Sequence, residues 1–145
     1  MAQEKQTYAN HTRWYPVWHF FAFPVTAIAA LHLTWGAIRD PSTMHILYAI
    51  YGFAIAAAVF ASRAMAMRVQ DRLIRLEMRL RLKEIVPPAL FARFGELSLR
   101  QIVGLRFAGD AEMVGLMERV LKGELTEEKA IKQAVKDWQG DYIRA

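Results

Sequence analysis

Two long stretches without Asp, Glu, Lys or Arg constrain the fold of this chain more than any other feature of its sequence. The first covers the 25 residues between Arg13 and Arg39, and the second covers the 22 residues between Asp40 and Arg63. An α-helix rises 1.5 Å per residue, so about 20 apolar residues cross the hydrocarbon core of a bilayer. Both stretches are therefore long enough to be membrane spans.

We predict a transmembrane hairpin over residues 15–66, after an N-terminal tail at 1–14, with helices at about 15–38 and 42–66. One alternative is a pair of core helices in a soluble bundle, but only about 80 residues would remain to cover them. A second alternative is a cleaved signal peptide ending near Ala30. Pro24 and the many aromatic residues of the stretch argue against it.

The basic residues predict the orientation of this hairpin. The chain has a formal net charge of +5, and residues 63–83 account for all of it, with seven basic and two acidic residues. Lys5 and Arg13 precede the first stretch, whereas the connecting turn has only Arg39, beside Asp40. The positive-inside rule then places both termini in the cytoplasm.

Residues 67–86 predict a basic amphipathic helix that continues from the second span and stops at Pro87-Pro88. One stripe is apolar and includes Leu73, Leu76 and Leu80. A neighbouring stripe is basic and consists of Arg68, Arg72, Arg75 and Arg79. Three roles are compatible with this helix. It is exposed to solvent without a partner, it binds anionic lipid headgroups, or it packs against a partner subunit or a second copy of the chain. Nucleic acid is not an expected partner, because no recognition helix or stacking platform accompanies the arginines.

The tail at 87–145 predicts a small cytoplasmic module of short helices. Ser98 and Gln101 fit a capping box that opens a helix to about Phe107. Asp110 is the predicted cap of the next helix, which ends before Gly123, and Thr126-Glu127-Glu128 opens a last helix to about Trp138. About 58 residues make a marginal core, so we expect the module to lean on the basic helix or on a partner.

No pattern in the sequence indicates catalysis. The chain has no cysteine, which excludes disulfides, thiolate metal sites and thiol nucleophiles. It contains no phosphate-binding loop, dinucleotide fingerprint or nucleophile elbow. We therefore predict no catalytic residues, no metal site and a non-enzymatic protein.

Three histidines lie in the predicted spans, where ionisable groups are candidates for function. His32 and His45 lie toward the outer end of the hairpin, and His19 toward the other end. Two interpretations of these histidines are possible. They ligate haem or chlorophyll, or they form hydrogen bonds with lipid headgroups or neighbouring helices. His19 and His32 are thirteen residues, or about 20 Å, apart and do not share one metal within a monomer. No cofactor is predicted, and His32 is the best single candidate for one.

Small residues recur every four positions in the second span and favour close helix packing, although alanine is abundant throughout this region. One series contains Gly52 and Ala56, and the other contains Ala54, Ala58 and Ser62. They predict packing within the hairpin or against another membrane subunit.

Three segments carry a resemblance to a known family: residues 10–21 (NHTRWYPVWHFF), 68–77 (RVQDRLIRLE) and 97–108 (LSLRQIVGLRFA). Together they resemble a domain-of-unknown-function family of small bacterial membrane proteins with two predicted spans. The resemblance implies a bacterial membrane protein with a cytoplasmic helical tail, and we expect this protein in the inner membrane. It implies no activity, ligand or catalytic residue.

These observations predict an all-α, multi-pass membrane protein. Its expected function is that of an accessory or scaffolding subunit that packs against other membrane subunits or itself. One alternative is a haem- or chlorophyll-binding subunit of a respiratory or photosynthetic complex. The other is an adaptor on an anionic lipid surface.

Overall fold

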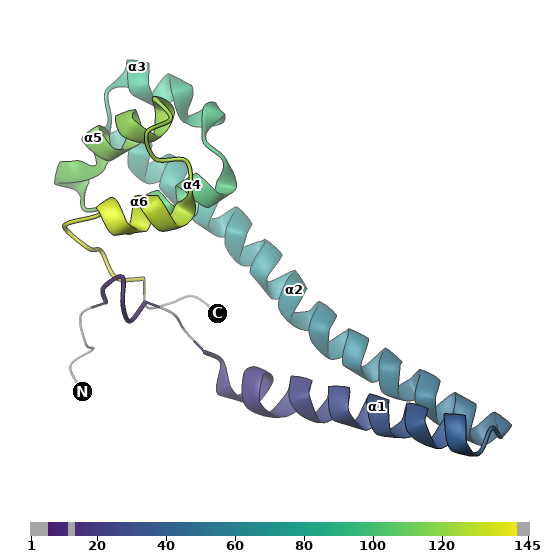
Figure 1. The fold of residues 1–145 in the computed structure, drawn as a ribbon. Helices are drawn as coiled ribbons and strands as arrows, with labels where there is room; N and C mark the ends of the chain where they lie inside the picture. Colours follow the sequence, from purple (N-terminus) through teal and green to yellow (C-terminus); the bar gives the residue numbers. More distant parts are fainter. Residues whose placement is uncertain (1–5, 12–13, 142–145) are drawn as a thin grey trace. The chain divides into compact units, whose positions relative to one another are not determined.

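The computed structural model describes residues 6–11 and 14–141, and in these residues every regular element is helical. The predicted all-α class is confirmed. The elements in chain order are η1 (Val17–Ala22), α1 (Phe23–Arg39), α2 (Thr43–Ile85), α3 (Pro88–Phe91), η2 (Ala92–Glu96), α4 (Leu99–Leu105), α5 (Asp110–Leu121) and α6 (Glu128–Ala134) (Figure 1). The described residues form two compact units, one from residues 14–68 and the other from residues 6–11 and 69–141.

Two helical segments, Val17–Arg39 and Thr43–Ile85, are long and apolar enough to cross a membrane. The first is not one uniform α-helix, because η1 is a π-helix in which the Phe23 N–H donates to the Trp18 carbonyl. This wide turn comes directly before Pro24, which has no N–H to donate to a preceding turn. A π-helical entry to α1 is therefore a feature that the sequence pattern did not predict.

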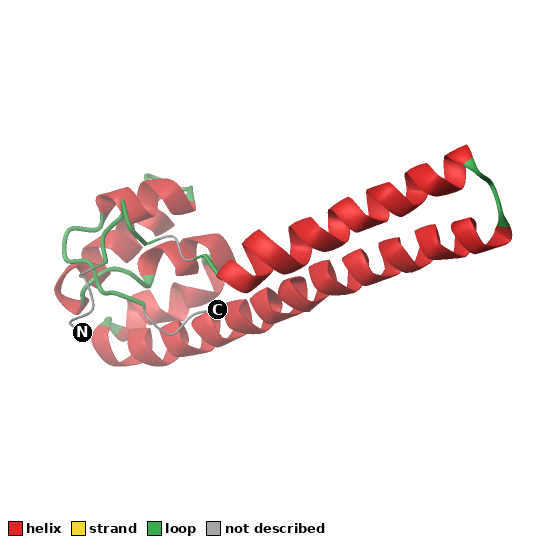
Figure 2. Ribbon diagram, turned by 90° about the horizontal axis from the view of Figure 1, so that it is seen from below, coloured by secondary structure: helices red, strands yellow, loops and turns green. Residues whose placement is uncertain are grey.

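The second segment is one continuous 43-residue helix, α2, which covers both the predicted helix at about 42–66 and the predicted helix at 67–86 that continues from it. Its start is stabilised by Ser42, whose hydroxyl accepts a hydrogen bond from the His45 N–H at 3.2 Å. It ends before Pro87 and Pro88, neither of which has the N–H that a helix needs. α1 and the first part of α2 run antiparallel, side by side (Figures 1 and 2).

The core of the second unit forms on the last part of α2. Ile74, Met78 and Leu82 recur every four residues along one face of α2, and Val86 follows directly after the helix at the same spacing; all four are buried. They join a cluster from the tail helices that includes Ile102, Leu105, Met113, Met117, Val120 and Ile131. The tail therefore shares its core with α2.

The predicted helix starts in the tail are correct at two positions and wrong at one. Ser98 and Gln101 form the predicted capping box, with Ser98 Oγ accepting from the Gln101 N–H at 3.3 Å. Gly109, and not Asp110, is the N-cap of α5. Asp110 therefore lies in the first turn, where its negative charge interacts favourably with the positive end of the helix dipole. α6 begins at Glu128 with Glu127 as its N-cap, within the predicted start at Thr126-Glu127-Glu128.

The last helix is shorter than predicted, since α6 ends at Ala134 and not near Trp138. The Glu112 carboxylate accepts hydrogen bonds from the N–H groups of Lys136 and Asp137, at 3.0 Å each, which holds these two residues in a bend outside the helix. Trp138 then forms an isolated antiparallel bridge with Ala108. The 131, 135, 138 spacing of apolar residues resembles a helix, but tertiary hydrogen bonds end it earlier.

The segment before η1 packs against the end of the tail. Gln6 Nε2 donates to the Asp141 carbonyl at 3.1 Å, and the Asp141 N–H donates to Gln6 Oε1 at 2.8 Å. His11 Nε2 lies 3.3 Å from Lys132 Nζ. Residues 6–11 thus belong to the same unit as the tail, 135 residues away in sequence.

Candidate functional site

The two apolar helices are in close contact at Gly52. A Cβ atom at this position would lie 3.0 Å from Ala30 Cα and 3.2 Å from Leu33 Cδ1. Ala30 is only 2% exposed, and Ala56, one turn after Gly52, is half-buried. The Gly52 and Ala56 series therefore lies on the packed side of the hairpin.

A second contact joins η1 to α2. Trp18 Nε1 donates a hydrogen bond to the Val59 carbonyl at 3.0 Å. The Arg63 guanidinium lies 5.4 Å from the centre of the Trp18 ring, which also stacks on Phe23 at 5.1 Å. The indole N–H of Trp18 thus donates to a main-chain carbonyl, and one face of the ring contacts a cation. This arrangement is common where an apolar segment meets a polar one.

The remaining surface of the two helices is apolar and uncovered. Only 6% of the residues in the most apolar part of each helix are buried. Ala54, Ala58 and Ser62 are exposed, so this second small-residue series points away from the α1 contact. The exposed large side chains include Phe20, Phe21, Ile28, Leu31, Ile38, Tyr51, Phe53, Ile55, Phe60 and Met65.

The three histidines lie in different surroundings. His19 Nδ1 is 2.9 Å from the Tyr15 carbonyl, and His45 Nδ1 is 2.7 Å from the Asp40 carbonyl, so both rings are engaged by the main chain. His32 is exposed on α1. Because Gly52 lies against Ala30, His45 is level with residue 37, about 7.5 Å along the axis from the level of His32. Pigment binding by these residues stays a prediction.

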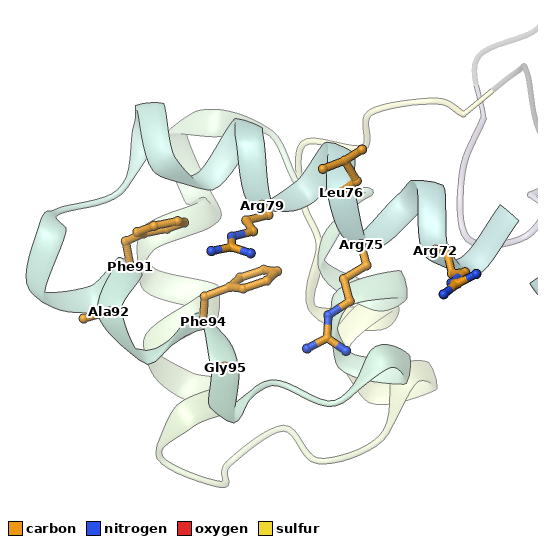
Figure 3. A pocket seen from close by; sticks show the side chains of 8 residues that line it. All are labelled: Arg72, Arg75, Leu76, Arg79, Phe91, Ala92, Phe94 and Gly95. Carbon is orange, nitrogen blue, oxygen red and sulfur yellow. The ribbon is translucent and has the colours of Figure 1, made fainter. Parts of the chain in front are cut away.

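The two stripes on α2 have separate positions. Leu73, Leu76 and Leu80 are each more than half exposed, on the side of α2 away from the core. Arg72, Arg75 and Arg79 line a groove with Leu76, Phe91 and Phe94, with a volume of about 630 Å³ (Figure 3). Arg68, the fourth arginine of the predicted stripe, is not among the residues that line it.

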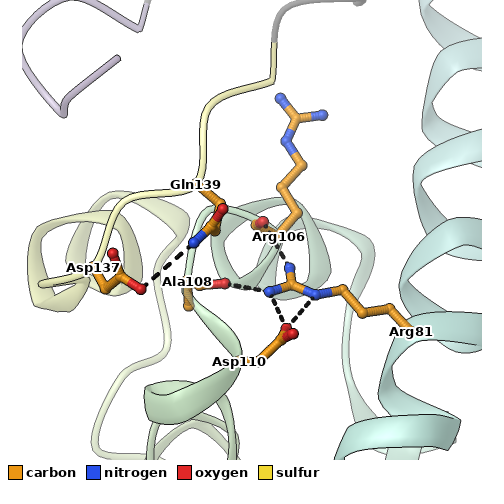
Figure 4. A network of polar contacts seen from close by, with 6 residues as sticks. All are labelled: Arg81, Arg106, Ala108, Asp110, Asp137 and Gln139. Carbon is orange, nitrogen blue, oxygen red and sulfur yellow. Dashed lines mark hydrogen bonds and ion pairs between the residues drawn. The ribbon is translucent and has the colours of Figure 1, made fainter. Parts of the chain in front are cut away.

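Sequence reasoning missed the structural role of Arg81, which it counted only as a charge. Arg81 donates to Asp110 Oδ1 through Nε at 2.8 Å and through Nη2 at 2.6 Å. It also donates to the carbonyls of Arg106, at 3.2 Å, and Ala108, at 2.7 Å (Figure 4). One guanidinium thus ties α2 to the start of α5.

Sequence reasoning also missed a cationic and aromatic cluster. Phe107 and Trp138 stack with ring centres 4.6 Å apart, and the Arg106 guanidinium lies 4.5 Å from the Phe107 centre. Lys132 is 8% exposed and pairs with Glu128 Oε1 at 2.6 Å. Each cation contacts an aromatic face or a carboxylate, so packing accounts for these residues. Among the described residues, no three His, Asp or Glu side chains gather to hold a metal ion.

Comparison with known proteins gives one match. No curated protein and no solved structure shows significant similarity to the chain. A family profile, described as "Family of unknown function (DUF6526)", matches residues 1–145, which is the whole sequence. The chain therefore belongs to the DUF6526 family, a family of unknown function.

Proposed function

We propose that this protein is a non-enzymatic subunit of the bacterial inner membrane, in which η1–α1 and the first part of α2 form a transmembrane hairpin that packs against other membrane subunits. The observation that carries the proposal is the apolar surface of these helices, of which only 6% of the central residues are buried. A core helix of a soluble protein would be mostly covered by its own chain. Lipid and a membrane partner are the surroundings that suit this surface.

The docking of residues 6–11 supports the topology of the proposal. The segment before the first apolar helix and the segment after the second one belong to one packed unit, through Gln6 with Asp141 and His11 with Lys132. Segments that pack together lie on the same side of a membrane. A chain that crosses the membrane an even number of times, as a two-helix hairpin does, has these two segments on the same side. The basic residues favour the cytoplasmic side for both segments.

The outward series Ala54, Ala58 and Ser62 is the proposed contact for a partner subunit. Without a hydrophobic driving force in lipid, helices associate through close packing, which small side chains permit. The other small series is already used within the hairpin, where Gly52 meets Ala30. The exposed series thus remains available for a helix from a partner or a second copy.

The first experiment tests membrane insertion. Carbonate washing of native membranes is expected to leave the full-length protein in the pellet, and an external protease is expected to spare residues 69–141 in right-side-out vesicles. Release of the protein by carbonate would overturn the proposal.

The second experiment tests the partner face. A photo-crosslinking amino acid at Ala58 is expected to give a discrete crosslinked protein in native membranes, and Ala54→Leu is expected to abolish it. The matched control is the same crosslinker with Ala57→Leu, which adds the same volume about 100° around the helix from Ala58. Equal crosslinking in the two variants, or crosslinks to lipid alone, would contradict the assignment of this face.

A further inference from the structure

The groove between α2 and the α3–η2 turn has a basic side and an apolar side. α2 contributes Arg72, Arg75, Arg79 and Leu76, and the turn contributes the rings of Phe91 and Phe94. Figure 3 shows Arg75 and Arg79 extending from α2 toward the turn. The two rings are stacked with centres 6.1 Å apart, and Leu76 is 54% exposed. No acidic side chain lines the groove.

The arginines of this groove differ from others in the same unit. Arg81, Arg93, Arg106 and Arg119 each form an ion pair with a carboxylate. Within residues 6–11 and 14–141, by contrast, Arg72, Arg75 and Arg79 form neither an ion pair nor a hydrogen bond. Three like charges at spacings of three and four residues repel one another, and an anion between them would relieve that repulsion.

Guanidinium chemistry narrows the class of anion. A guanidinium presents its N–H groups as a planar fork, which matches two oxygens of a phosphate group, and it is less strongly hydrated than a lysine ammonium. Several such forks around one groove favour a group with several negatively charged oxygens. The neighbouring leucine and phenylalanine side chains favour a ligand whose phosphate is attached to an apolar or aromatic body.

We propose that this groove binds the phosphate group of an amphiphilic phosphorylated ligand, with Arg75 and Arg79 on the phosphate and Leu76 and Phe91 against its apolar part. The same chemistry is offered by the headgroup of an anionic phospholipid and by a soluble aryl or acyl phosphate. The site lies wholly within the second unit, so it does not depend on which subunit contacts the hairpin.

The experiment measures binding to the full-length protein in a non-ionic detergent and a phosphate-free buffer, by calorimetric titration. One arm uses phenyl phosphate as the soluble probe. The other uses dihexanoyl phosphatidylglycerol below its micellar concentration, with dihexanoyl phosphatidylcholine as the zwitterionic reference. Preference for phosphatidylglycerol over phenyl phosphate identifies a lipid headgroup as the source, and the reverse preference identifies a soluble ligand; either supports the site.

The variant Arg75→Gln/Arg79→Gln is expected to lose affinity for the bound probe by about tenfold or more, because charge-assisted hydrogen bonds disappear. Arg119→Gln/Lys122→Gln removes two positive charges outside the groove, one from α5 and one from the residue directly after it, and is expected to bind within about twofold of the original protein. An equal loss in the two variants would identify non-specific charge attraction and overturn the proposal. Absence of binding to both probes would also overturn it.

Discussion

Replacing Gly52 by leucine is expected to force the two apolar helices apart. A Cβ at this position would lie 3.0 Å from Ala30 Cα, 3.2 Å from Leu33 Cδ1 and 3.4 Å from Ala30 Cβ. Carbon atoms in good contact are about 3.5–4.0 Å apart, so the Cβ alone requires a shift of about 0.5 Å against backbone. Leucine adds three more carbon atoms to the same space.

Two opposing energies decide the size of the effect. Overpacking of a close contact costs about 1–3 kcal/mol, whereas replacing a helical glycine by alanine gains about 1 kcal/mol from helix propensity. Gly52→Ala is therefore expected to lower the free energy of unfolding by about 0–2 kcal/mol. Gly52→Leu is expected to lower it by about 2 kcal/mol or more. Gly36 in α1 is the matched control, since a Cβ there would meet no atom within 4 Å.

The assay has a stability readout and a distance readout. The free energy of unfolding is measured by circular dichroism during a titration from mild detergent into sodium dodecyl sulfate. Because the chain has no native cysteine, spin labels at Leu31→Cys and Tyr51→Cys report the separation of the two helices. An unchanged distance with Gly52→Leu, together with a stability equal to that of Gly36→Leu, would refute the close-packing argument.

Three further predictions concern contacts outside this helix crossing. Arg81→Ala removes hydrogen bonds to one carboxylate and two carbonyls and is expected to destabilise the chain by about 2 kcal/mol in thermal unfolding. Trp18→Phe loses one hydrogen bond and is expected to cost about 1 kcal/mol in the same detergent titration, whereas Trp35→Phe is expected to be near neutral; equal effects would contradict the assignment. Arg93 lowers the pKa of the Glu96 carboxyl, chiefly through a hydrogen bond, so Arg93→Gln is expected to raise this pKa toward its ordinary value of 4.5 in an NMR titration. The stabilisation from this pair is present above pH 4.5 and is lost as the pH falls through the lowered pKa of Glu96.

Local signals predicted the parts of this fold that depend on neighbouring residues. The length of the apolar stretches predicted the long helices, and the Ser98 to Gln101 spacing predicted a capping box that the structure contains. Each of these depends on residues within a few turns of one another. They could be read from the chain without knowing what packs against it.

Contacts between distant residues were not predictable in the same way. The bend at Lys136, where the helix has ended, follows from a carboxylate, Glu112, that is 24 residues earlier. The periodicity near Met78 offered two apolar faces, and nothing local distinguished the face that enters the core from the one at Leu76 that stays exposed. The groove forms only because the α3–η2 turn packs beside α2. The spacing of the arginines along α2 does not predict that packing.

The paired hydrogen bonds between Gln6 and Asp141 set an order of events during synthesis. They join residues that are 135 positions apart, so they form only after both apolar helices have been translated. At about 5–20 residues per second, the ribosome needs on the order of 10 s to pass from one residue to the other. During that interval residues 6–11 lack their hydrogen-bonding partner Asp141. Once Phe107 has been translated, its ring lacks its stacking partner until Trp138 follows. Completion of the second unit therefore requires that translation has passed Asp141 and that residues 6–11 have stayed within reach of it.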